Sequence, residues 1–489
     1  MECGDSSSAW QRPDPAYGDL RAHFEARYAE SGLQGAAMAL MKDGVIVFAA
    51  AAGERDPLAG EPMTVRTRSR NGSTLKMQTA TALLHQQDLG VLSVQDGIHD
   101  WLPNLDLALS PGHMDEVTLH DLISHQGGFY DYTPVIPDDA SETAESHAYG
   151  YFADNIYALA PAGSFFNYAN PNYSLAGLVA SKAADTDYDT LMQETVFDPL
   201  CMSRASFDPE AVAADDVWAT VQYTDQAGEL AWATPESFNH AFSRPAGLAW
   251  MTVLDLLHFQ HFLMEGDAAV LSDAARTAMV TGQVRTLGAG DHSWYGYGVF
   301  LHDGFQVGNA WYGTPVWEHT GGLGGYTTMV FTLPNEGVSG AVLQVGAGEW
   351  LADVVLGALV EVTDLTPTTP PEIPYDPAVL DAAVGTYTDP FNVGTLEVTR
   401  VDDTLHIDAP RLDEYDVPYA DTLYWHGYAT FVWAIDGGSY GVTFIDDDAD
   451  LNNGFRWFRN RIFVAERAAP ITRAAVPSQP PRLDVGLLW

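Results

Sequence analysis

The sequence is poor in basic residues and in cysteine. Its 489 residues include 22 Lys and Arg against 66 Asp and Glu, which gives a formal net charge of -44. A field of this sign repels the phosphates of nucleic acids and of anionic membranes, so neither is an expected partner. The two cysteines, Cys3 and Cys201, are too few for a disulfide-dense scaffold.

Metal-binding patterns and long apolar runs are absent as well. Neither His-Glu-x-x-His nor Cys-x-x-Cys occurs, so the sequence indicates no metal and no cofactor. A membrane-spanning helix needs about 18 consecutive apolar residues, and no such stretch is found. With 46% hydrophobic residues, the chain can nevertheless bury a large core.

The scarcity of lysine draws attention to Lys76, one of only three lysines, which follows Ser73 by three residues. Residues at this spacing are neighbours on a helix, and apolar residues after Lys76 recur at helical spacing. A lysine whose pKa is lowered by burial can accept the proton of a serine hydroxyl. Ser73 and Lys76 are therefore a candidate nucleophile and base. Taken alone, the pair also fits a solvated helix turn.

Two polar clusters further along the chain extend this candidate site. Tyr168-Ala169-Asn170 interrupts an aromatic run, and the segment from His319 to Gly322 precedes an alternating strand expected at Thr327–Leu333. The elements Ser-x-x-Lys, Tyr-x-Asn and His-x-Gly, in this order, resemble those of the serine β-lactamase and penicillin-binding protein superfamily. The resemblance covers roughly residues 17–363.

Three longer segments carry the same resemblance. Residues 70–103 are similar to the family's active-serine helix and the turn after it. Residues 117–129 resemble its Leu-Leu-x-His-x-Ser-Gly-Leu segment, with Gly127 in place of the usual serine. Residues 243–263 resemble its Ala-Gly-Gly-Leu helix. Several matches in the right order are far more specific than one short motif.

The resemblance implies a role for each site residue. Ser73 attacks a carbonyl, Lys76 or Tyr168 removes its proton, and Tyr168 passes a proton to the leaving group. The resemblance also implies an oxyanion hole made by the backbone amides of Ser73 and Gly322. Asn170 is expected to contact the substrate amide and Lys76. His319 and Thr320 are expected to face the polar end of the substrate, and Gly321 to let the backbone approach it closely.

The histidine in the third motif narrows the expected function. Most family members carry lysine there, whereas His319 is similar to D-stereospecific peptidases, some esterases and stand-alone peptide cyclases. The leading prediction is a serine hydrolase of amide or peptide bonds, with D-configured residues in its small peptide substrate. A carboxylesterase, a peptide cyclase or transpeptidase, and a binding or sensor protein that is acylated without turnover remain as alternatives.

The expected fold class is α+β. A helix at 17–31, strands at 36–41, 45–50, 296–301 and 327–333, and a helix at 351–362 predict one antiparallel sheet flanked by helices. Helices dominate between 73 and 265 and predict a helical subdomain. Beyond a Pro-rich break, short alternating runs at 395–399, 404–407, 430–434, 441–445 and 456–459 predict an antiparallel β-barrel, which resembles the lipocalin-like domain of several superfamily members.

These patterns divide the chain into five parts: a flexible N-terminal segment (1–15), a β-lactamase-like domain (16–364), a linker (365–377), a lipocalin-like barrel (378–467) and a tail (468–489). Cys3 and the polar stretch after it resemble the start of a mature bacterial lipoprotein. That resemblance predicts a lipid anchor at Cys3 and a place in the bacterial envelope or periplasm. A flexible cytoplasmic terminus with an accidental cysteine is the alternative.

Overall fold

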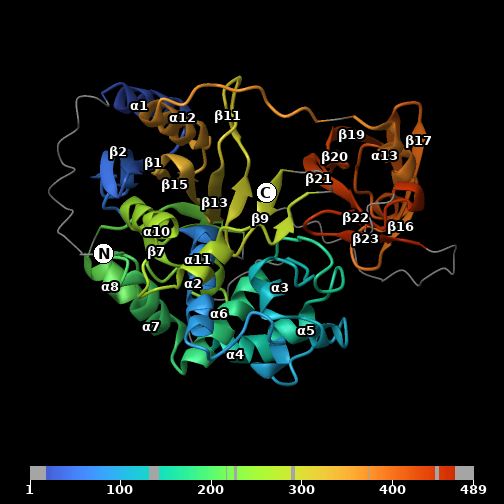
Figure 1. Ribbon diagram of the computed structural model, residues 1–489, viewed down its shortest axis with the longest axis horizontal. Helices are drawn as coiled ribbons and strands as arrows, with labels where there is room; N and C mark the ends of the chain where they lie inside the picture. The colour runs from blue at the N-terminus through green and yellow to red at the C-terminus, as the bar shows by residue number, and fades with distance from the viewer. Residues whose placement is uncertain are drawn as a thin grey trace.

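The computed structural model describes residues 18–131, 142–215, 217–224, 228–287, 292–373, 375–446 and 451–468. They form a nine-stranded antiparallel sheet with helices around it and a separate closed barrel of eight strands (Figure 1). The predicted α+β fold with a C-terminal barrel is confirmed. Residues 1–15 and the tail from 469 onward lie outside the described residues, as does the lipid anchor predicted at Cys3.

The large sheet joins strands from both ends of the region between residues 35 and 345. β1 pairs with β2 on one side and with β15, some 300 residues later, on the other. The strands follow the order β3 (Glu61–Pro62), β2 (Val45–Asp56), β1 (Gly35–Lys42), β15 (Val338–Val345), β14 (Tyr326–Leu333), β13 (Val316–Leu323), β10 (Phe300–His302), β9 (Ser293–Tyr295) and β8 (Val284–Arg285).

The turn between β1 and β2 shows how local sequence sets this register. Asp43 and Gly44 have φ of 50° and 75°. Positive φ at both central residues is the mark of a type I′ turn, which matches the twist of the strands it joins. The segment Lys42-Asp43-Gly44 predicts a turn of hairpin type between the strands expected at 36–41 and 45–50, and the structure has this hairpin, with Asp43 and Gly44 as its two loop residues.

Helices cover both faces of the sheet. α1 and α12 share one apolar cluster with β1 and β15, and α2 and α10 pack on the opposite face. α2 is buried almost all round because it lies between the sheet and the helical subdomain. The longer and site-forming helices are α1 (Gly18–Ser31), α2 (Leu75–Asp88), α3 (Leu119–Ile123), α4 (Ala144–His147), α6 (Asn170–Ala184), α7 (Tyr188–Met192), α8 (Pro209–Asp215), α9 (Arg244–Gly247), α10 (Val253–Glu265), α11 (Asp273–Met279) and α12 (Ala352–Thr363).

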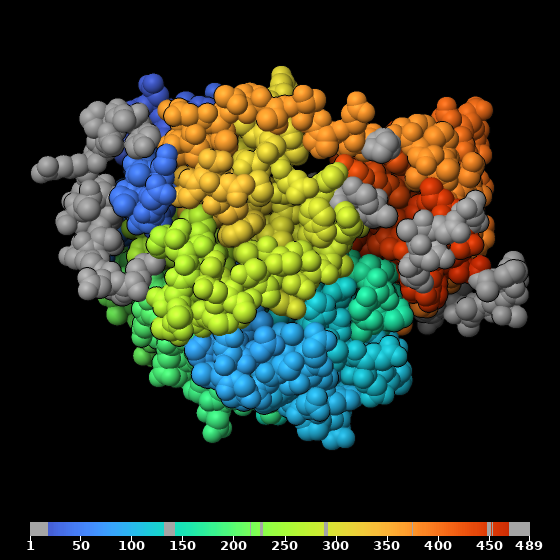
Figure 2. Space-filling model, in the orientation of Figure 1, coloured from blue at the N-terminus to red at the C-terminus, as the bar shows by residue number. Residues whose placement is uncertain are grey.

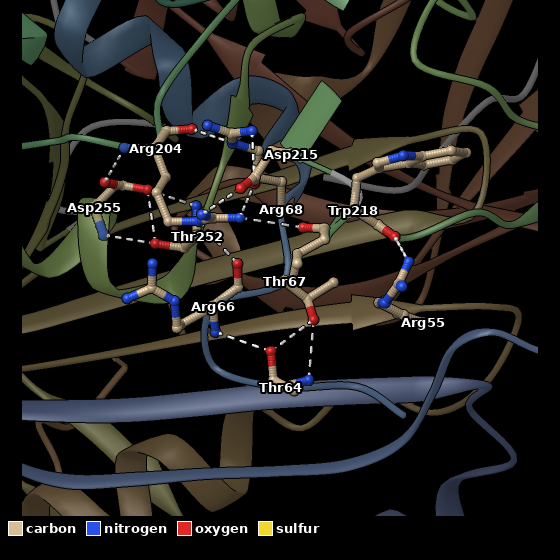
Figure 3. A network of polar contacts seen from close by, with 11 residues as sticks. Arg55, Thr64, Arg66, Thr67, Arg68, Arg204, Asp215, Trp218, Thr252 and Asp255 are labelled. Atoms are coloured by element: carbon tan, nitrogen blue, oxygen red, sulfur yellow. Dashed lines mark hydrogen bonds and ion pairs between the residues drawn. The ribbon is translucent and has the colours of Figure 1, made fainter. Parts of the chain in front are cut away.

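A polar network fastens the segment that leads into α2 to the helices beside it (Figure 3). Arg68 donates to Asp215 at the end of α8 over 2.9 Å, and Arg204 donates to the same carboxylate over 3.1 Å. The backbone amide of Arg204 donates to Asp255, which also closes a capping box with Thr252 at the start of α10. The chain entering the site is thus held from two helices.

In the barrel, strand β17 shows the alternation of buried and exposed residues most clearly. In β17, Leu396 and Val398 are buried while Thr395 and Glu397 are exposed, as a strand with one face on a core requires. Pairing of β16 with β23 closes the ring. Its strands are β16 (Gly385–Asp389), β17 (Gly394–Val401), β18 (Thr404–Asp408), β19 (Thr422–Gly427), β20 (Thr430–Ile435), β21 (Gly438–Ile445), β22 (Trp457–Arg459) and β23 (Val464–Arg467).

The barrel packs on the segment that precedes α6. Tyr157 stacks on Phe391 with ring centroids 4.0 Å apart and donates to Asn392 over 3.0 Å. Phe165 meets Trp457 edge to face. Figure 2 shows the red barrel against the rest of the molecule, with the orange chain after α12 crossing the top towards it.

Two expectations differ from the structure. The strand expected at 296–301 is confined to β10, because Gly298 adopts a φ of 84° and breaks it. β16, β19 and β23 of the barrel were not predicted. Among the described residues, no helix is long and apolar enough to cross a membrane.

Candidate active site

Ser73 lies in a 3-10 turn, η2 (Gly72–Thr74), that runs directly into α2. The turn sits hard against β13. Gly72 has a φ of 55°, and a Cβ placed on it would stand 2.6 Å from the backbone nitrogen of Gly322. Only glycine tolerates both this conformation and this approach. The half-buried nucleophile candidate is therefore presented at the seam between a helix and the sheet.

Lys76 is fully buried and reaches three oxygen atoms. Its Nζ lies 2.9 Å from Ser73 Oγ, 2.8 Å from Asn170 Oδ1 and 2.6 Å from the carbonyl oxygen of Ala246 on α9. A neutral amine has two N–H donors and one lone pair. Asn170 and Ala246 can only accept here, so they use both donors and leave the lone pair facing the hydroxyl of Ser73.

The electrostatics favour this neutral form. Burial lowers the pKa of Lys76 well below its usual value, and the nearby guanidinium of Arg461 lowers it further, while Asp131 acts in the opposite direction. Desolvation penalises the charged form of any lysine. Lys76 thus has both the geometry and the charge state of a general base.

Tyr168 stands over the same pair. The Nζ atom of Lys76 is 5.0 Å from the centroid of the Tyr168 ring. The Tyr168 hydroxyl is hydrogen-bonded to Ser73. Burial raises the pKa of Tyr168, with partial opposition from Arg461 and from the Ser73 bond. The phenol accordingly keeps its proton near neutrality. It suits a proton donor or relay better than a first base.

His125 supports the tyrosine from behind. The centroid of the His125 ring lies 4.1 Å from the centroid of the Tyr168 ring, and its Nδ1 accepts a hydrogen bond from the amide of Ala169 over 3.2 Å. Burial holds the pKa of His125 well below its usual range, so the ring is neutral. His125 is the histidine of the segment that resembles Leu-Leu-x-His-x-Ser-Gly-Leu.

Asn170 is held by a carboxylate that sequence reasoning did not find. The Asn170 backbone amide and side-chain Nδ2 donate to Asp131 Oδ1 over 2.7 and 3.1 Å. This double contact points the side-chain oxygen of Asn170 at Lys76. The other oxygen of Asp131 accepts from Arg461 Nε over 2.7 Å and is 2.5 Å from its Nη2.

Arg461 comes from the loop between β22 and β23 of the barrel. Its guanidinium carbon lies 4.5 Å from the centroid of the Tyr168 ring, so it is both an ion-pair partner and a cation over the ring. Asn167 donates to the backbone oxygen of Arg461 over 3.1 Å. The barrel therefore contributes a charged side chain to the candidate site.

His319 is buried inside β13 rather than on an exposed edge. Its Nδ1 donates to the carbonyl oxygen of Thr320 over 2.6 Å, and its Nε2 is 3.4 Å from the hydroxyl of Tyr295. Burial, reinforced by Lys76, lowers the pKa of His319 to about 3. A neutral imidazole cannot attract a substrate carboxylate as a lysine would, which leaves orientation of Thr320 and of the strand as the role that this geometry supports.

The backbone of β13 completes the set. A Cβ on Gly321 would lie 2.8 Å from the amide nitrogen of Ser73, so strand and turn are in direct contact there. Gly322 touches Gly72 in the same way. The structure thus brings together all eight residues predicted from sequence: Ser73, Lys76, Tyr168, Asn170, His319, Thr320, Gly321 and Gly322. Their catalytic roles stay predictions.

Comparison with known proteins agrees with this arrangement. The family model described as Beta-lactamase matches residues 20–357. The chain belongs to the beta-lactamase family. Within that family, Penicillin-binding protein 4 of Amycolatopsis lactamdurans is 26% identical over 387 residues, which cover 74% of this chain and 95% of that protein.

Two solved structures share the fold of this beta-lactamase-family chain. SurE with D-Leu has a TM-score of 0.64 at 20% identity and covers 93% of this chain and 99% of its own, so the likeness extends over the barrel. A D-stereospecific amidohydrolase from Streptomyces sp. has a TM-score of 0.58 at 22% identity, covering 72% of this chain and 100% of its own. Membership of this family makes a hydrolase the general expectation.

Proposed function

We propose that the protein is a serine hydrolase that forms an acyl-enzyme on Ser73 and acts on amide or peptide bonds, with D-configured residues in the substrate. The observation that carries the proposal is the buried Lys76 amine, whose two donors are taken by Asn170 and Ala246 and whose third contact is Ser73 Oγ at 2.9 Å. Such a group activates a serine without a histidine base.

The proposed cycle uses four groups. The Ser73 oxygen bonds to the substrate carbonyl carbon while its proton moves to Lys76, and the negative oxygen is met by the amides of Ser73 and Gly322. When the C–N bond breaks, the amine leaves with a proton delivered through Tyr168. Water then attacks the acyl-enzyme carbonyl and passes a proton to Lys76. As the bond to the Ser73 oxygen breaks, Lys76 returns that proton to the serine, and the acid is released.

The preference for amides of D-configured residues rests on family likeness. One structural neighbour is named a D-stereospecific amidohydrolase and another holds D-Leu. We propose a small peptide or amide as substrate on that support. An ester needs no protonated nitrogen as leaving group, so a carboxylesterase using the same residues is the second candidate.

Intact-protein mass spectrometry after incubation with a fluorophosphonate and with D- and L-phenylalanine amide tests the proposal. We expect one fluorophosphonate adduct on the parent and none on Ser73→Ala, together with release of D-phenylalanine only. Lys76→Ala should lose labelling, whereas Lys182→Ala, which removes a partly exposed lysine paired with Glu145, should keep it. Labelling of Ser73→Ala at the parent rate would overturn the assignment.

Incubation with two further substrates, short acyl esters and a D-Ala-D-Ala peptide thioester, separates the alternatives. Turnover of short acyl esters without any amide turnover would indicate the carboxylesterase. A cyclic or aminolysed product from a D-Ala-D-Ala peptide thioester would indicate a cyclase or transpeptidase. A stable stoichiometric adduct with no released product would indicate a sensor.

For the location, we propose the bacterial envelope, with support from the penicillin-binding protein among the relatives and from the sequence around Cys3. Expression with a lipoprotein signal, followed by palmitate labelling of the parent and of Cys3→Ser, tests the anchor. Equal labelling of both would contradict it. We also propose that 16–364 and 378–467 are the two domains, which limited proteolysis within 365–377 would test.

A further inference from the structure

A second cluster of reactive side chains lies around α4, on residues that the proposed hydrolase does not use. Glu142 lies two residues before α4, His147 ends that helix, and His240 lies shortly before α9. Glu142 Oε2 is 3.1 Å from His147 Nδ1 and 3.2 Å from His240 Nε2, and the three atoms all lie within 4.8 Å of one another.

These separations suit a metal ion. Ligand atoms bound tetrahedrally at about 2.0–2.1 Å stand roughly 3.3 Å apart, which two of the three distances already match. The third separation, between the two imidazole nitrogens, closes by rotation of one ring. The rings of His147 and His240 meet edge to face with centroids 4.6 Å apart, and a ring nitrogen of each lies within 4.8 Å of the other.

The surroundings are those of a built site. The side chains of His147 and His240 are 3% and 0% exposed, whereas that of Glu142 is 28% exposed. The solvent side thus has room for a water ligand at the carboxylate. Phe242 and Tyr151 pack on the His147 ring with centroids 4.8 and 5.3 Å away, and such an apolar shell limits water access and strengthens binding.

The chemistry of the donors agrees. A bound ion takes the lone pair of one ring nitrogen, so each neutral imidazole must carry its proton on the other. For His240 the other nitrogen, Nδ1, lies 3.3 Å from Ser243 Oγ, which can accept that proton in a hydrogen bond. Hydrogen-bonded ring nitrogens of this kind orient metal-bound histidines in proteins.

We propose that Glu142, His147 and His240 form a binding site for zinc or a similar borderline divalent cation, with water as the fourth ligand. Two imidazoles and one carboxylate are ligands that such ions prefer over Mg²⁺ and Ca²⁺, which favour oxygen donors. The ion joins α4 to the turn of α9, the helix whose Ala246 accepts the hydrogen bond from Lys76. The ion would therefore have a structural role, because it holds together two segments that support the candidate active site.

Sequence reasoning did not find this cluster and indicated no metal. The three residues are 5 and 93 positions apart, a spacing that matches no metal motif. Only the fold brings them together.

The test is zinc binding by the full chain after treatment with a chelator. We expect one equivalent of Zn²⁺ by metal analysis and calorimetry, visible absorption bands with Co²⁺ in its place, and a melting temperature that rises with Zn²⁺ in the presence of excess Mg²⁺. Glu142→Gln and His240→Gln should each weaken binding at least tenfold. Glu142→Gln keeps a hydrogen-bonding side chain, which limits the risk of misfolding.

Asp115→Asn is the matched control. Asp115 pairs with His99 at 3.3 Å, and no third ligand joins them in the part of the chain that the structure describes, so its loss should leave zinc binding unchanged. Equal affinity of parent and Glu142→Gln, full displacement of Zn²⁺ by Mg²⁺, or no bound zinc would each overturn the proposal. Displacement by Mg²⁺ would point to diffuse binding by the acidic surface instead.

Discussion

At the scale of single residues, the charge state of Lys76 governs the expected chemistry. Its pKa is lowered by burial, so the amine loses its proton at a lower pH than a free lysine does. We expect kcat/KM for an uncharged substrate to rise with pH through this lowered pKa. The raised pKa of Tyr168 keeps the phenol protonated, so no loss of activity should follow at mildly alkaline pH.

A pH–rate profile checks this expectation. Lys182→Ala should show the same profile as the parent because Lys182 is far from the site chemistry and pairs with Glu145. A rate that falls between neutrality and about pH 9 would show that a protonated Lys76 is the active form.

Gly72 tests the contact between η2 and β13. Gly72→Ala must adopt a φ of 55° and place its Cβ 2.6 Å from the Gly322 nitrogen, so the turn must withdraw from the strand. We expect kcat to fall at least about 10²-fold, as when one oxyanion donor is lost.

Gly60→Ala is the control for Gly72. Gly60 has a φ of 69°, but nothing lies within 4 Å of its Cβ position, so it reports backbone strain alone. That strain costs roughly 1–2 kcal/mol of unfolding free energy. Urea unfolding and steady-state rates measured on both variants separate the two effects. Equal behaviour of the two would mean that the close approach has no catalytic importance.

At the scale of elements, Arg70 holds the strand before the nucleophile. It is fully buried on β4 (Ser69–Arg70), and its guanidinium donates to the backbone oxygens of Leu248, Pro235 and Ser237. Burial lowers its pKa to about 9, without a carboxylate bonded to it. Trp250 also donates to the oxygen of Pro235, so the carbonyls of Leu248 and Ser237 are the two that depend on Arg70 among the described residues.

We expect Arg70→Leu to lower the free energy of unfolding by about 2 kcal/mol or more, because it leaves the backbone oxygens of Leu248 and Ser237 without donors, whereas that of Pro235 keeps the bond from Trp250. Urea denaturation measures the loss. Arg66→Leu, at an exposed position four residues earlier, should cost less than about 0.5 kcal/mol. Similar values for the two variants would contradict the role assigned to Arg70.

Sequence patterns predicted these elements unequally. The α1 helix, the β1–β2 hairpin and the Ser-x-x-Lys turn were predicted because their signals are local: apolar spacing, a two-residue turn and a short motif. The strand expected at 296–301 is interrupted at Gly298, because its positive φ breaks a strand that apolar spacing alone suggests. β19 and β23 were missed because their alternation is short and interrupted.

At the scale of the whole molecule, the candidate site needs two parts of the chain. All eight predicted residues lie in short motifs or beside them, but Asp131 and Arg461 meet across 330 positions of sequence. No local pattern marks such a pair, and a single sequence carries no record of their contact. The sequence predicted the barrel but not its position, and only the folded structure shows that Arg461 of the barrel enters the site.

Arg461 provides a test of the barrel as part of the site. Its charge lowers the pKa of Lys76, whereas Asp131 raises it. We expect Arg461→Ala to leave Asp131 uncompensated, to raise the pKa of Lys76, and so to move the rising limb of the pH–rate profile to higher pH.

Arg461→Lys should restore most of this shift, because it keeps the charge although it loses the two-pronged contact. Arg456→Ala, which removes a barrel arginine paired with Glu466, is the control and should leave the profile in place. A profile unchanged by Arg461→Ala would mean that the barrel arginine only holds the two parts together.

The distance in sequence between Ser73 and Arg461 also fixes an order of events during synthesis. At about 5–20 residues per second, a ribosome makes Arg461 roughly 20 to 80 seconds after Ser73. During that interval the nascent chain carries its nucleophile but lacks the cation that balances Asp131. The proposed site is therefore complete only after the last strands of the barrel have been made. A chain that ends before them carries Ser73 without Arg461.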